Sequence, residues 1–144
     1  MSTLKKAIEI AVAAHKDQVD KTGSPYVEHL FRVMNLGKNE EEKICGVLHD
    51  LVEDTYWTFE DLSTEGFSSE IMDALRCVTK TSETKDYNAF IDRIVCNRLA
   101  IAVKINDLTD NLDVRRLDAI SKKDVPRINK YLKAYKRLVA LKNQ

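Results

Sequence analysis

A helical spacing of apolar residues runs through nearly the whole chain, and few residues interrupt it. Among 144 residues there are only four glycines and two prolines, the residues that most often punctuate regular structure. No stretch shows the period-two alternation of a half-buried strand, and no internal repeat is present. These observations predict an all-α protein, a bundle of about six or seven helices, folded as a single domain over residues 1–144.

Local signals predict where the helices begin and end. The predicted helices cover roughly residues 4–17, 26–36, 40–54, 70–79, 87–96, 98–112 and a last helix from 124, and residues 58–62 are expected to form a short capped turn of helix. Thr3 or Ser2 is suited to cap the first helix and Asn39 the third. Pro25 is expected in the first turn of the second helix, and Gly37 after its last turn. A polar connection is expected at residues 80–85.

Composition excludes several classes of function. Lys plus Arg and Asp plus Glu number 23 each, so the formal net charge is zero and no overall field favours nucleic acid or an anionic membrane. No apolar run reaches the roughly 18 residues of a membrane span. The first residues lack a signal peptide's apolar block, which predicts a cytoplasmic protein. The three cysteines are dispersed and give no disulfide framework. No signal indicates an oligomeric state.

The stretch Cys45–Asp54 (C-G-V-L-H-D-L-V-E-D) concentrates groups that could hold a metal. If it is helical, His49 and Glu53 share one face. Asp50 and Asp54 then lie about 100° round the helix from them. Because the neighbouring residues are apolar, the helix should be at least half buried, where unpaired carboxylates are costly. A cation is the natural partner for such a group.

Two further residues have the chemistry of ligands but are weaker signals alone. His29 falls in the apolar stripe of its helix, where a lone histidine is more often a hydrogen-bonded core residue. Asp107 lies within an apolar helix between Ile105 and Leu108, so we expect Lys104, a metal or a polar cavity beside it. The alternative is an ordinary surface carboxylate at a helix edge.

Together these pieces resemble a known family. His29 follows a G-S-P-Y loop, H-D-L-V-E-D occupies 49–54, V-T-K occupies 78–80, and V-K-I-N-D-L-T-D-N-L occupies 103–112. The ordered set resembles the HD-domain metal-dependent phosphohydrolases. It is most similar to the hydrolase domain of the bifunctional RelA/SpoT enzymes and to the small alarmone hydrolases. The resemblance covers roughly residues 7–117.

The resemblance implies an HD-type helical fold and a role for each residue of the set. The implied ligands of one divalent ion are His29, His49, Asp50 and Asp107. The resemblance implies manganese, the ion of the better-known relatives, and iron or zinc are alternatives because mixed nitrogen and oxygen donors suit all three. Glu53 and Asp54 are expected beside the ion as acid/base and water-orienting groups, with the roles undivided between them. The residues expected to line the nucleotide site are Lys21, Thr22 and Asn111.

The implied activity is removal of the 3′-pyrophosphate from guanosine tetra- or pentaphosphate, which gives GDP or GTP. The chain departs from the family pattern at Asp20, where an Arg usually precedes the Lys, and at Leu30, Asn106 and Asp110. Asp20 favours an alternative, an HD phosphohydrolase acting on another nucleotide phosphate ester such as a nucleoside monophosphate or NADPH. A second alternative is a helical module that binds metal or nucleotide without turning it over.

Overall fold

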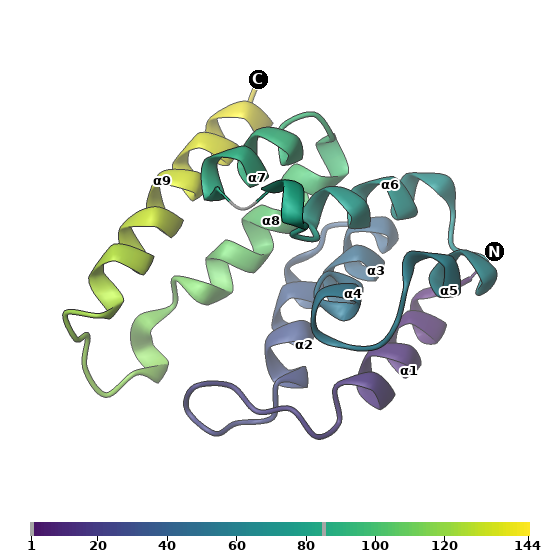
Figure 1. Cartoon of the computed structure of the whole chain (residues 1–144), viewed down its shortest axis with the longest axis horizontal. Helices are drawn as coiled ribbons and strands as arrows, with labels where there is room; N and C mark the ends of the chain where they lie inside the picture. The colour runs from purple at the N-terminus through teal and green to yellow at the C-terminus, as the bar shows by residue number, and fades with distance from the viewer. Residues whose placement is uncertain (1, 85) are drawn as a thin grey trace.

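The computed structural model describes residues 2–84 and 86–144, which form helices joined by short connections (Figure 1). The elements in these residues are α1 (Leu4–Ala14), α2 (Val27–Leu36), α3 (Glu40–Leu48), α4 (Leu51–Asp54), α5 (Phe59–Thr64), α6 (Ser69–Val78), the 3₁₀ turn η1 (Ser82–Thr84), α7 (Tyr87–Ile94), α8 (Arg98–Asn111), the 3₁₀ turn η2 (Val114–Arg116) and α9 (Asp124–Lys142). Only α4 and α5 have fewer than eight residues, so the seven longer helices match the predicted number. The all-α class is confirmed. No helix in the described ranges is both long and apolar enough to cross a membrane.

Two helices, α3 and α8, lie at the centre of the packing. Helix α3 contacts α1, α2, α6 and α8, while α8 also contacts α7 and α9. Figure 1 shows α9 lying along α8 on one side of the molecule and α1 at the opposite side of α3. Every residue of 100–108 in α8 is buried, which is typical of a helix enclosed on all sides. The polar side chains within this segment therefore lie inside the protein.

Close packing of α2 on α3 brings two predicted ligands together. A Cβ atom on Gly46 of α3 would lie 3.2 Å from the backbone of Met34 in α2. The absence of a side chain at Gly46 therefore lets the two backbones approach closely. His29 on α2 and His49 at the end of α3 then face each other, with ring centroids 5.4 Å apart.

Most helix starts agree with the sequence, whereas several ends differ. Thr3 and Asn39 cap α1 and α3 as predicted. The first helix ends at Ala14 instead of about residue 17, because the backbone leaves helical geometry at His15. Pro25 precedes α2 instead of lying in its first turn, and it pairs with Val19 in an isolated β-bridge. The predicted connection at 80–85 contains η1, and Lys85 lies outside the described residues.

The predicted single helix over residues 40–54 is wrong, because α3 and α4 are separate helices. The break falls at His49 and Asp50, where Asp50 has φ −102° and ψ 1°. The His49 Nδ1 atom lies 2.6 Å from the Gly46 carbonyl oxygen, the acceptor that the Asp50 amide would use in a continuous α-helix. Side-chain hydrogen bonding thus competes with the helix at the residues expected to bind metal.

Candidate active site

The four predicted metal ligands lie close together, although they come from three parts of the chain. His29 Nε2 lies 3.1 Å from Asp107 Oδ1 and 3.9 Å from Asp50 Oδ2. His49 Nε2 lies 3.2 Å from the same Asp107 oxygen and 3.1 Å from Asp50 Oδ2. Ligand atoms of His29, His49 and Asp50 all fall within 4.8 Å of one another. The grouping has the donors and the spacing of a divalent metal site.

The donor set also fits a cation on electrostatic grounds. His49 Nε2 is buried and makes no hydrogen bond of good geometry, although carboxylate oxygens of Asp50 and Asp107 lie 3.1 and 3.2 Å away, so it is free to act as a ligand atom among acceptors. Burial alone would lower the pKa of His49, but the Asp50 and Asp107 carboxylates outweigh it and hold that pKa well above its ordinary value. The pKa of His29 is likewise raised, despite burial, by Asp107 and Asp110. The pocket therefore stabilises positive charge.

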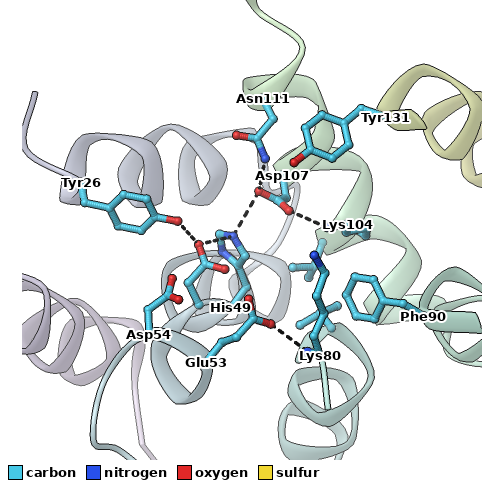
Figure 2. Close-up of a pocket in the computed structure, with 13 residues that line it drawn as sticks. Tyr26, His49, Glu53, Asp54, Lys80, Phe90, Lys104, Asp107, Asn111 and Tyr131 are labelled. Carbon is cyan, nitrogen blue, oxygen red and sulfur yellow. Dashed lines mark hydrogen bonds and ion pairs between the residues drawn. The ribbon is translucent and has the colours of Figure 1, made fainter. Parts of the chain in front are cut away.

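A salt bridge and an amide hold Asp107 in place. Lys104 Nζ lies 2.9 Å from Asp107 Oδ2, and Asn111 Nδ2 donates to Oδ1 at 3.0 Å (Figure 2). Burial would raise the pKa of Asp107, but Lys104 and the two imidazoles hold it well below its ordinary value. Lys104 is therefore the neighbour that the sequence led us to expect beside this acid. The surface alternative for Asp107 is excluded because the residue is 6% exposed.

Tyr26 supports Asp50 from the loop before α2. Its hydroxyl donates to Asp50 Oδ2. Burial, and then the negative charge of Asp50, raises the pKa of Tyr26 above its ordinary value, so the phenol remains a donor. The pKa of Asp50 is lowered because the pull of His49 exceeds the effect of burial. Tyr26 belongs to the G-S-P-Y loop motif, but the sequence does not indicate its contact with Asp50.

The two candidate acid/base residues lie at the mouth of the same cavity and differ in their contacts. Glu53 Oε1 accepts a hydrogen bond of 2.8 Å from the backbone amide of Lys80, as Figure 2 shows. The Asp54 side chain lines the same cavity and has no such backbone partner in the described residues. Partial desolvation, together with the charges of Asp50 and Glu53, raises the pKa of Asp54.

The cavity around these groups has a volume of about 220 Å³. Its lining combines the ligand acids with two lysines and aromatic rings, namely Tyr26, His49, Asp50, Glu53, Asp54, Val78, Lys80, Phe90, Val103, Lys104, Asp107, Asn111 and Tyr131. We call it the acidic cavity. The Lys80 ammonium lies 5.6 Å from the centre of the Phe90 ring. No ion pair of Lys80 is found within residues 2–84 and 86–144, so a cation is available near the acids.

A second cavity of about 320 Å³ adjoins the first, and Tyr26, Asn111 and Tyr131 line both. Lys21 and Thr22 line only the second, which we call the loop cavity. The predicted nucleotide residues therefore divide, with Asn111 at the junction and the loop residues beyond it.

Asp20 holds the loop of this second cavity in place. Its Oδ1 atom accepts hydrogen bonds from the Thr22 amide, the Thr22 hydroxyl and the Ser24 amide at 2.9, 2.7 and 3.0 Å. The Thr22 hydroxyl is the largest influence lowering the pKa of Asp20. Asp20, which stands where an Arg was expected from the family pattern, is thus a hydrogen-bond acceptor that shapes the turn.

A cluster of ion pairs centred on Asp110 lies next to His29 and was not predicted from the sequence. Asp110 contacts His29, Arg32 and Arg116. Burial would raise the pKa of Asp110, but these contacts, His29 foremost, lower it to about 2. The signal available in the sequence was the spacing of three between Asp107 and Asp110, which places both acids on neighbouring positions of one helix face.

The chain is similar in sequence to known proteins over most of its length. No protein-family model matches the chain. A GTP pyrophosphokinase of Myxococcus xanthus is 32% identical over 145 residues, which cover 89% of this chain and 19% of the relative. A guanosine-3′,5′-bis(diphosphate) 3′-pyrophosphohydrolase of Aquifex aeolicus is 30% identical over 120 residues, or 76% of this chain and 17% of the relative. The chain thus spans less than a fifth of these two relatives.

A solved structure shares the fold. It is that of a metazoan orthologue of SpoT that hydrolyses ppGpp, and it matches with a TM-score of 0.77 and 23% identity over 98% of this chain and 85% of that chain. These matches confirm the predicted resemblance: the chain is similar in sequence to part of the two bacterial proteins and shares the fold of the metazoan SpoT orthologue.

Proposed function

We propose that the protein is a metal-dependent hydrolase that removes the 3′-pyrophosphate from guanosine tetra- or pentaphosphate and releases GDP or GTP. The observation that carries the proposal is the close approach of two imidazoles and two carboxylates, three of which (His49, Asp50 and Asp107) line the cavity that Glu53 and Asp54 also line. Relatives named for this activity and for guanosine polyphosphate synthesis support the choice of nucleotide. Because the relatives are much longer than this chain, their activity is proposed for it and not transferred directly.

The residues proposed to hold the ion are His29, His49, Asp50 and Asp107. Manganese is the first choice and iron or zinc the alternatives, because two nitrogen and two oxygen donors suit each of them. When bound, such an ion supplies Lewis-acid chemistry at a phosphoryl oxygen and makes hydroxide available near neutral pH. Lys104 and Asn111 restrain the Asp107 carboxylate from both of its oxygens, which keeps this ligand oriented toward the imidazoles.

The different contacts of Glu53 and Asp54 suggest different roles. Glu53 is tied to the Lys80 amide, so it is suited to orient water and to place the Lys80 ammonium near a phosphate. Asp54, with its raised pKa, is suited to accept a proton from the attacking water and deliver it to the leaving oxygen. The acidic cavity would then take the scissile phosphates and the loop cavity the nucleoside.

The test is pyrophosphate release from guanosine tetraphosphate by the purified protein with Mn²⁺. Asp50→Ala should abolish release, while Asp73→Asn, which removes an exposed carboxylate on α6, should leave it unchanged. A parallel panel should contain a nucleoside monophosphate and NADPH. If one of these is hydrolysed and guanosine tetraphosphate is not, the protein is a phosphohydrolase for another nucleotide phosphate ester. Asp20 in the loop is the reason for including this alternative. Binding of nucleotides without any turnover would favour the non-catalytic module.

A further inference from the structure

The two histidines proposed to bind the metal, His49 in the lining of the acidic cavity and His29 in that of the loop cavity, are oriented by different kinds of partner. A histidine that binds metal through Nε2 must carry its proton on Nδ1, and the group that accepts this proton sets the ring orientation. For His49 the partner of Nδ1 is the Gly46 carbonyl at 2.6 Å, a neutral acceptor on its own helix. For His29 the partner is the Asp110 carboxylate, also at 2.6 Å, from a helix distant in sequence.

We propose that Asp110 is a positioning residue for the metal site, which fixes the tautomer and orientation of His29 through a carboxylate–imidazole–metal arrangement. The inference rests on the proposed function only in taking His29 as a metal ligand. Asp110 itself touches neither the ion nor the substrate in this scheme. It acts by holding the imidazole that does.

The register of α8 makes the arrangement possible. Asp107 and Asp110 are three residues apart, so their side chains project from adjacent positions of the same helix. The His29 ring lies between them, with Nε2 3.1 Å from Asp107 and Nδ1 2.6 Å from Asp110. One helix thus presents a carboxylate to each nitrogen of the same imidazole. The nitrogen facing the acidic cavity is Nε2, as metal binding requires.

Two arginines hold Asp110 and offset its charge. Arg32 Nε donates to Oδ1 at 2.6 Å, and Arg32 Nη2 donates to Oδ2 at 3.2 Å. Arg116 reaches Oδ1 at 3.3 Å and the Asp110 backbone carbonyl at 2.9 Å. The Asp110 side chain is only 4% exposed, and a buried carboxylate with two guanidinium partners stays ionised and immobile. Arg32 is one helical turn from His29, so the clamp links α2 directly to α8.

The first experiment measures metal affinity in the full chain, by competition of Mn²⁺ between the protein and a chelating dye. We expect Asp110→Asn to weaken Mn²⁺ binding about 10- to 100-fold, the usual cost of losing such an outer partner. The matched control is Asp113→Asn. Asp113 follows the same helix and also contacts Arg116, at 3.8 Å, but belongs to the η2 cap. This control should bind Mn²⁺ as the wild type does.

A second measurement needs no variant and is independent of folding losses. In the wild-type protein loaded with diamagnetic Zn²⁺, long-range ¹H–¹⁵N spectra should show a slowly exchanging proton on His29 Nδ1 and none on Nε2. Wild-type Mn²⁺ affinity in Asp110→Asn, or a His29 bound through Nδ1, would overturn the proposal.

These readouts also separate this inference from the proposed function. Loss of Mn²⁺ affinity in Asp110→Asn in a protein that hydrolyses no nucleotide would support the positioning role and reject the hydrolase. Normal Mn²⁺ affinity in Asp110→Asn, together with hydrolysis of guanosine tetraphosphate by the wild-type protein, would reject the positioning role and support the hydrolase.

Discussion

The acidic cavity and the loop cavity adjoin each other but are built in different ways. The acidic cavity takes its key groups from packed helices, and His49 and Asp107 in its lining are each less than 10% exposed. The loop cavity takes Lys21 and Thr22 from an exposed loop that Asp20 organises. Its arginines are paired, Arg32 and Arg116 with Asp110 and Arg127 with Asp124.

This difference separates chemistry from recognition. In the acidic cavity, carboxylates of Asp50 and Asp107 converge on His49 Nε2, which makes no hydrogen bond of good geometry, so a cation could be held there. In the loop cavity, the three arginines already have carboxylate partners, so a nucleotide must compete with acids of the protein for them. Metal binding and catalysis should therefore be sensitive to the helices, and substrate preference to the loop. Four substitutions test this contrast.

The largest expected effect on stability comes from Asp107→Leu in the acidic cavity. Lys104 is 10% exposed at its side chain and would lose its salt-bridge partner. Breaking a buried pair in this way costs about 3–5 kcal/mol of unfolding free energy. Urea unfolding of the metal-free protein measures it, and the double variant Lys104→Met/Asp107→Leu should recover much of the loss. A cost as small as that of an exposed pair, about 0.5 kcal/mol, would contradict the burial argument.

Asp54→Asn tests the catalytic role at the mouth of the acidic cavity. We expect kcat to fall about 100-fold, the lower range for losing a general acid/base, with unchanged Mn²⁺ affinity. Glu53→Gln is the comparison, because a glutamine oxygen can still accept the hydrogen bond from the Lys80 amide. Its kcat should fall less. A larger fall in Glu53→Gln than in Asp54→Asn would reverse the assigned roles.

Asp20→Ala tests the loop cavity. The change removes the acceptor of three hydrogen bonds in the loop. A net loss of about 1 kcal/mol in holding the bound loop corresponds to a KM raised about fivefold. Steady-state kinetics should show this rise with kcat nearly unchanged. A fall in kcat at constant KM would show that the loop also governs chemistry and would remove the contrast between the cavities.

The smallest effect is expected from Asp124→Asn. Asp124 is the first residue of α9 and lines neither cavity. Hydrogen bonds from Ser121, then from Arg127, lower the pKa of Asp124 to about 2. Because this pKa is depressed, its stabilising contribution is present above the unfolded value near 4 and is lost as pH falls toward 2. Unfolding curves of wild type and variant should therefore differ slightly at pH 6 and converge near pH 2. A difference that grows with acid would have the wrong sign.

How far the sequence could predict the fold depended on periodicity and caps. The apolar spacing of α2, α6 and α8 predicted those helices within a residue or two, and Asn39 marked the start of α3. The break between α3 and α4 escaped prediction because it depends on a side chain, His49, taking a backbone acceptor. Helix propensities do not account for such competition between a side chain and the backbone.

For the candidate site, the sequence identified the ligand-type residues but not their support. The H-D-x-x-E-D stretch and the acid within an apolar helix were visible because charges in apolar surroundings need partners. Their roles stay proposals. Tyr26, Arg32 and Asp110 were not predicted as a set, because their contacts join residues up to 81 positions apart. Spacing along one helix cannot reveal such pairs.

By itself, the sequence determined that this chain folds into helices with a few buried acids and imidazoles among them, because hydrophobic periodicity and the cost of burying charge are local properties. Only the tertiary structure decided which of those groups meet and what faces each nitrogen. The packing of α2 on α3 at Gly46 and the register of α8 placed His29 between two carboxylates. Such a placement depends on the relative position of three helices, which no single stretch of sequence encodes.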